Sequence, residues 1–270
     1  MKKKIKIYGK KIIDILSKPE MSILPANIAF YFVLALIPMF TLIILIASSF
    51  SISIDFIIDL VEKIFPPNVN DTIIEYIKKS SLDTNTWIFN IIAFIVASNW
   101  TNAIVVASNE LYGVDSKNFI KDRLKAFLLL IIIITLLLFL IVVPILGEQI
   151  INLLTNIQVL NRMIPDIEYI YNLLIWPITF IIIYFNLKLI YEIAPSKNID
   201  KDSTTKGALL TTICWVLATF VFSIYINHFA NYDVIYGNLS TLIILMIWLY
   251  ALSYIFVFGI CINSIKYHNK

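Results

Sequence analysis

The sequence predicts an all-α membrane protein: a polytopic bundle of six transmembrane helices, with both termini inside and short amphipathic helices at the surface. Hydrophobic residues make up 60% of the chain and charged residues 14%, whereas soluble domains are about half apolar and about a quarter charged. With a mean hydropathy of +0.87, much of the chain must have lipid as its solvent. Helices are the expected spanning form, because the strands of a membrane β-barrel are about ten residues long and alternate in polarity.

Six apolar stretches are long enough to cross a hydrocarbon core of about 30 Å, which takes about 20 helical residues. They lie near residues 26–49, 87–110, 126–146, 170–191, 207–229 and 239–265. Helix-ending residues stand at or beside their ends, as expected: Gly113, Gly147, Gly207, Gly237 and Pro195. We therefore expect a single integral membrane domain over residues 1–270.

Residues 1–22 are predicted to form a basic cytoplasmic leader. In this leader Ile5, Ile12 and Leu16 share one helical face and are surrounded by lysines. The pattern suits an amphipathic helix lying on an anionic inner leaflet. A solvated leader that only sets the topology fits the residues equally well, so both interpretations stay open.

Residues 50–86 are predicted to be an extracytoplasmic amphipathic segment. Two apolar stripes at helical spacing occur in it, and the sequence FPPN at 65–68 separates them. Such short helices would cap the bundle or rest on the outer leaflet.

The basic residues predict the orientation. With both termini inside, all but four of the 21 Lys and Arg residues lie on the cytoplasmic side. The four outside are Lys63, Lys78, Lys79 and Arg162. Because positive charge is retained on the cytoplasmic side, both termini are predicted to be cytoplasmic.

No catalytic or metal-binding pattern is recognisable in the sequence. The two histidines, His228 and His268, stand apart from other metal-ligand residues, and no Gly-rich loop follows a strand. Cys214 and Cys261 lie in apolar runs and are expected to be reduced packing residues. We therefore predict no enzyme activity, no catalytic residue, no metal and no cofactor. The basic residues follow the topology rule, so no nucleic-acid partner is expected either.

The second predicted span carries an unusual number of polar residues. On a helical wheel Asn99, Asn102, Asn109 and Glu110 fall within a stripe about 100° wide. Such a stripe should face the bundle interior or a wet cavity, as packing that joins helices or as a surface that meets a substrate. Because Glu110 lies near a helix C-terminus, where the macrodipole disfavours an anion, we expect a cationic or donor partner from the adjacent basic loop.

Two other spans contribute candidates. In the first, Asn27, Tyr31 and Pro38 lie on one face. Pro38 in the first span and Pro177 in the fourth are predicted to kink their helices. Kinks that only improve packing are the alternative.

Four stretches carry a resemblance to a known family. They are ANIAFYFVLALIPMF at 26–40, ASNELYGVDSKNFIKDRLKAF at 107–127, APSKNIDKDSTTKGALLTTICW at 194–215 and YGNLSTLIILMIWLYALSYIFVFGICIN at 236–263. The chain resembles the YihY/BrkB family of bacterial inner-membrane proteins, once labelled ribonuclease BN. The resemblance implies a multi-pass protein of the inner membrane, linked to envelope integrity, serum resistance or lipid export, and a nuclease label that is a misattribution. The chain departs from the family at Ile260 and Cys261, where members often carry Ala-Glu.

Three hypotheses for the function follow. The first is a transporter or flippase-like carrier of an amphiphile, such as an anionic lipid or a lipid-linked glycan. Its predicted path is lined by Asn27, Tyr31, Asn99, Asn102, Asn109 and Glu110. The alternative is a non-transporting membrane scaffold for envelope biogenesis, and the third is a membrane-bound ribonuclease, for which no catalytic residues are recognisable. Membrane lipids are the expected partners, including anionic inner-leaflet lipids at the basic leader.

Overall fold

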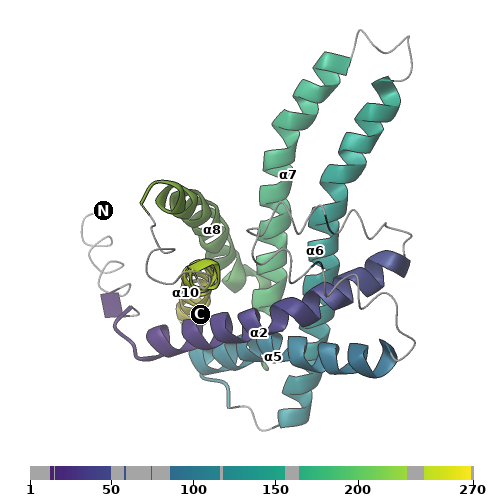
Figure 1. Cartoon of the computed structure of the whole chain (residues 1–270). Helices are drawn as coiled ribbons and strands as arrows, with labels where there is room; N and C mark the ends of the chain where they lie inside the picture. The colour runs from purple at the N-terminus through teal and green to yellow at the C-terminus, as the bar shows by residue number, and fades with distance from the viewer. Residues whose placement is uncertain are drawn as a thin grey trace, which may run out of the picture.

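The protein folds into long helices. The computed structural model describes residues 13–14, 16–49, 58, 74, 86–115, 118–155, 164–229 and 240–268, and within them every regular element is a helix. The long helices are α2 (Glu20–Ser49), α5 (Thr86–Tyr112), α6 (Phe119–Thr155), α7 (Ile164–Ile193), α8 (Lys201–Phe229) and α10 (Ser240–His268) (Figure 1). The predicted all-α class is confirmed.

Each predicted span lies within one of these helices or overruns its end by a residue. Several helices begin earlier than predicted, because a polar first turn can be capped. The side-chain oxygen of Asn118 accepts the Lys121 N–H at 3.2 Å, just before α6, and that of Asp200 accepts the Asp202 N–H at 3.4 Å, before α8.

Three helices are long and apolar enough, over the described residues, to cross a membrane. These stretches are Ile91–Tyr112, Lys201–Tyr225 and Leu242–Ile265. The count of six spans and the cytoplasmic placement of both termini stay predictions.

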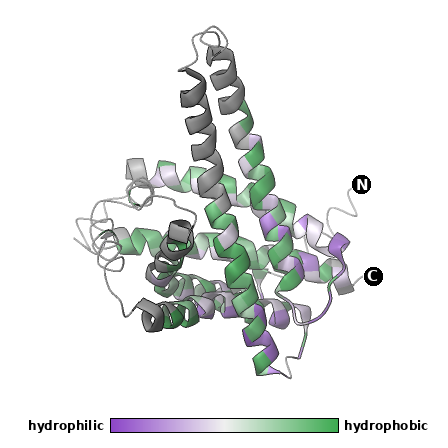
Figure 2. Ribbon diagram, turned by 90° about the vertical axis from the view of Figure 1, so that its right-hand side faces the viewer, coloured by the Kyte–Doolittle hydropathy of each residue, from purple (hydrophilic) through white to green (hydrophobic). Residues whose placement is uncertain are grey.

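The helices pack in pairs. Helix α2 packs most extensively on α5, and α10 packs on both α8 and α2. Helices α6 and α7 form a hairpin that crosses the α2–α5 pair and projects beyond it (Figure 1). Figure 2 shows hydrophilic residues gathered near the two termini and at the tip of α6 opposite to the hairpin end.

Two clusters of buried apolar residues hold the bundle together. One draws on all six helices, and the other joins α2, α5 and α6. Where α2 meets α5, the rings of Phe32 and Trp100 are 4.3 Å apart, and fully buried alanines such as Ala35 and Ala97 allow the two backbones to approach. This close, antiparallel pairing fixes which face of α5 stays outside.

The crossing of α8 and α10 depends on two glycines. A Cβ at Gly207 would overlap the Asn263 amide, and a Cβ at Gly259 would overlap the hydroxyls of Thr211 and Tyr191. The Asn263 Oδ1 atom accepts the Gly207 N–H at 2.8 Å, and the two hydroxyls lie 2.8 Å apart. The contact is of the kind that small residues permit in membrane bundles.

Several predictions fall on the edge of the described residues. Ile5 and Ile12 of the leader lie outside them, as does almost all of the 50–86 segment, and Leu16 is an exposed residue just before α2. Helix α2 is continuous through Pro38, and α7 is continuous through Pro177. The predicted kinks stay predictions.

Candidate functional site

The four polar residues predicted on α5 do not share one environment. Asn109 is buried, Asn99 and Asn102 are half-buried, and Glu110 is exposed. Between them Val106 is 45% exposed, so this stretch of the face lies at the surface of the folded chain. The single stripe of the helical wheel is thus divided into a buried residue and a surface lane.

Asn109 ties the end of α5 to the connection between α7 and α8. Its Nδ2 donates to Ser196 Oγ at 3.0 Å, and its Oδ1 accepts the Ser196 N–H at 2.6 Å. Ser196 Oγ in turn donates to Asp122 Oδ1 at 2.5 Å, and Lys125 Nζ donates to the Pro195 carbonyl at 2.5 Å. We call these five residues the clasp. They join α5, α6 and the α7–α8 connection, so Asn109 has the role of a packing residue.

Lys125 is the half-buried cation of the clasp. Burial lowers the pKa of its ammonium below the usual value, and the nearby Asp122 carboxylate opposes the shift. The ammonium donates to the carbonyl of Pro195, the residue before Ser196. The clasp therefore contains one base and one acid within a half-buried set of hydrogen bonds.

Asn99 and Asn102 lie on an outward strip of α5 that we call the lane. We define the lane as Ile95, Asn99, Asn102 and Val106, which follow one another along the outward face of α5. Ile95 is 44% exposed. Neither amide side chain has a hydrogen-bond partner among the described residues. An amide left without a partner in hydrocarbon is costly, so each group needs a partner from outside the described residues, such as water, a ligand or another polar group.

Glu110 lies at the end of the same face. Helix α5 ends there in a left-handed turn, in which Gly113 has φ +62° and its N–H donates to the Glu110 carbonyl at 3.1 Å. Among the described residues no cation pairs with the Glu110 carboxylate. Lys117 of the predicted basic loop lies outside these residues, so the expected partner stays a prediction.

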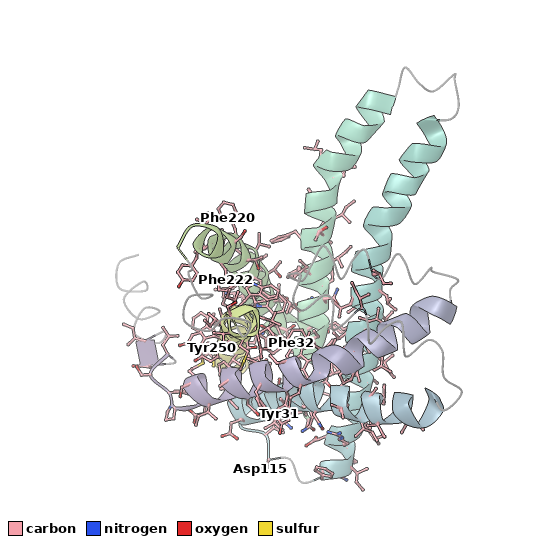
Figure 3. All side chains as sticks on the ribbon, in the orientation of Figure 1. Tyr31, Phe32, Asp115, Phe220, Phe222 and Tyr250 are labelled. Atoms are coloured by element: carbon pink, nitrogen blue, oxygen red, sulfur yellow. The ribbon has the colours of Figure 1, made fainter. Side chains whose placement is uncertain are left out.

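Asn27 and Tyr31 are the candidate site residues of α2. Both are half-buried, and Figure 3 shows Tyr31 projecting from α2 toward α5. Because the helices are antiparallel and Phe32 meets Trp100, Tyr31 stands near the level of Asn102. Their predicted position facing the polar residues of α5 is compatible with this register.

Arg123 borders the lane on the α6 side and was missed as a site residue. Its Nη2 donates to the Ile95 carbonyl at 3.2 Å, and its guanidinium lies over the Phe127 ring at 5.2 Å. The Phe127 ring is itself stacked on Phe94 of α5 at 5.2 Å. From the sequence alone, Arg123 is one of several basic residues that predict the orientation. No local pattern indicates that α6 crosses α5 at this point.

The outer surface also has an apolar hollow of about 290 Å³ between α2 and α10. It is lined by Ala26, Ala29, Phe30, Val33, Met246, Ile247 and Tyr250. These residues lie on the side of α2 that is turned away from α5, so the hollow and the lane are separate surfaces. No group of three His, Cys, Asp or Glu side chains able to hold a metal occurs in the described part of the chain.

Cys261 is one of the two positions at which the resemblance implies a departure from the family. It is buried, and its Sγ lies 3.5 Å from Met21 Sδ of α2. Lys18 and Glu20, at or just before the start of α2, act electrostatically on the same thiol, so charged groups also lie near this contact between α10 and α2.

Comparison with known proteins establishes the relationship. A family model described as "Virulence factor BrkB" matches residues 12–270. The ribonuclease-like protein YfkH of Bacillus subtilis (strain 168) is 27% identical over 250 residues, which cover 91% of this chain and 90% of that protein.

Membrane proteins described as UPF0761 match shorter stretches. One from Coxiella burnetii (strain Dugway 5J108-111) is 30% identical over 92 residues, 34% of this chain and 33% of that protein. One from Pseudoalteromonas translucida is 36% identical over 69 residues, 26% of this chain and 23% of that protein. No solved structure matches. The chain is a membrane protein and belongs to the BrkB family.

Proposed function

We propose that this BrkB family protein is a transporter or flippase-like carrier that moves an amphiphile across a bacterial inner membrane. The substrate would be an anionic lipid or a lipid-linked glycan. The proposal includes the orientation predicted from the basic residues, with both termini in the cytoplasm.

One observation carries the proposal: the half-buried amides of Asn99 and Asn102 have no hydrogen-bond partner among the described residues, and exposed apolar side chains flank them. A scaffold in which these residues join helices requires a partner for each amide, as Asn109 has in Ser196. The lane instead offers donors and acceptors beside exposed Ile95 and Val106. A polar headgroup can follow such donors while its acyl chains stay in lipid, which lowers the cost of carrying the headgroup through hydrocarbon.

Reconstitution of purified protein into liposomes tests the proposal. The proteoliposomes should expose fluorescent phosphatidylglycerol to an external quencher faster than empty vesicles do. Asn99→Leu and Asn102→Leu should slow the movement. Asn186→Leu is the matched control, because Asn186 is also half-buried but its Nδ2 donates locally to the Ile182 carbonyl at 2.9 Å. The proposal would be refuted if lipids and lipid-linked glycans crossed the membrane equally fast in protein-containing and in empty vesicles.

A further inference from the structure

We propose that Arg123, Asn99 and Asn102 form a subsite for the phosphate of an anionic amphiphile. The inference rests on the proposed function and names the chemistry that the lane recognises. It starts from Arg123, whose place beside α5 is set by contacts with two different helices.

The guanidinium of Arg123 lies at the level of Asn99. Its donor bonds the Ile95 carbonyl, and in an α-helix the carbonyl of Ile95 points to the N–H of residue 99. Asn102 is about 4.5 Å further along the helix axis. The carbonyl that Arg123 binds and the two amides therefore follow one another along about 10.5 Å of the α5 axis, between Ile95 and Asn102.

The guanidinium of Arg123 has further N–H donors and is held in position, which favours the binding of an anion. A guanidinium has five N–H donors, of which one bonds the Ile95 carbonyl, and the face of the group rests on Phe127. Within the described residues no carboxylate pairs with it. The stack of Phe94, Phe127 and Arg123 holds the cation in place, so less side-chain freedom is lost when a ligand binds.

Arg123 has no carboxylate partner among the described residues, and it lies against a stretch that can cross a membrane. Ile95 belongs to the Ile91–Tyr112 stretch that can cross a membrane and lies four residues from its start. Charged side chains within membrane spans are rare, and they pair or mark the path of a substrate. Arg123 lies outside the predicted spans and reaches one through its hydrogen bond to the Ile95 carbonyl. A phosphate accepts bidentate hydrogen bonds from arginine, and the amides supply two more donors.

Binding of soluble short-chain lipids to the full chain in uncharged detergent tests the subsite. The probes are dioctanoyl phosphatidylglycerol, dioctanoyl phosphatidylcholine, dioctanoylglycerol and inorganic phosphate, with affinities from thermophoresis. Phosphatidylglycerol should bind most tightly. Arg123→Gln should weaken it about tenfold or more, and each Asn→Leu change about fivefold. Arg123→Lys keeps the positive charge but cannot donate two parallel hydrogen bonds to a phosphate, so its affinity should lie between those of the wild type and Arg123→Gln.

Lys121→Gln is the matched control, because Lys121 is exposed in the same turn of α6 and carries the same charge. It should change the affinity by less than about twofold. Equal losses in Lys121→Gln and Arg123→Gln would overturn the subsite, as would no loss in Arg123→Gln. Equal binding of dioctanoylglycerol or phosphatidylcholine, or binding of inorganic phosphate as tight as that of the lipid, would overturn it too.

Transport assays on the same variants separate the two proposals. If Arg123→Gln moves lipid as fast as the wild type does, the subsite fails and the proposed function stands. If phosphatidylglycerol binds through Arg123 and no lipid is moved, the subsite stands and the proposed function fails. Size-exclusion profiles and thermal midpoints establish that each variant is folded; the i to i+4 bond of the Ile95 carbonyl does not depend on Arg123.

Discussion

Replacing Asn109 by leucine removes both hydrogen bonds between the end of α5 and the α7–α8 connection. Each such bond contributes about 0.6 to 1 kcal/mol. The Ser196 N–H that Asn109 accepts at 2.6 Å would lose its acceptor in a half-buried place, which costs about 1 to 3 kcal/mol. Asn109→Leu should therefore lower the free energy of unfolding by about 2 to 4 kcal/mol.

Replacing Asn99 or Asn102 of the lane by leucine should change the free energy of unfolding little. Asn99 and Asn102 have no protein hydrogen bond to lose among the described residues, so leucine at either position should shift the free energy of unfolding by less than about 0.5 kcal/mol or raise it. Unfolding in mixed SDS and neutral detergent micelles, followed by circular dichroism, gives the comparison. If Asn99→Leu or Asn102→Leu destabilises the protein as much as Asn109→Leu does, the separation of clasp and lane is wrong.

Three further predictions concern the bundle. Gly259→Ala should destabilise the protein by about 1 to 3 kcal/mol, because its Cβ overlaps the hydroxyls of Tyr191 and Thr211; an unchanged unfolding midpoint would contradict the tight crossing. Gly113→Val should cost about 1 to 2 kcal/mol, since φ is +62°, whereas Gly113→Asn should cost less; equal costs would argue against the left-handed turn. Burial lowers the pKa of Lys125 below 10.5, so the unfolded chain binds more protons between the lowered pKa and 10.5. Across that alkaline window wild-type stability should rise with pH relative to Lys125→Met; a parallel pH dependence of the two proteins would contradict the shift.

The long helices could be predicted because each depends on local composition. A stretch of about 20 apolar residues must be helical in lipid, whatever surrounds it. The ends were predicted less well, as at α8, where the capped polar turn from Lys201 to Lys206 extends the helix before the apolar stretch. Polar first turns are stabilised by caps that a hydropathy pattern does not detect.

The candidate site could be predicted only in part. The wheel placed Asn102 and Asn109 within about 20° of each other, yet one is half-buried and the other is buried in the clasp. Their difference arises from Ser196, which is 87 residues away from Asn109 in the chain. Arg123 was missed for the same reason, because its position depends on how α6 crosses α5. Contacts between distant segments leave no periodic signal in the sequence.

Cysteine accessibility tests the central claim, that the lane is a polar surface open to water or to headgroups. Single cysteines would be placed in a background with both native cysteines replaced by alanine, and labelled in membranes with a charged, impermeant thiol reagent. Asn99→Cys and Asn102→Cys should react. Ala97→Cys, buried in the α2–α5 contact, and Phe220→Cys, 65% exposed on the membrane-spanning stretch of α8, should not. Reaction at neither lane position, or equal reaction at Phe220→Cys, would contradict the account.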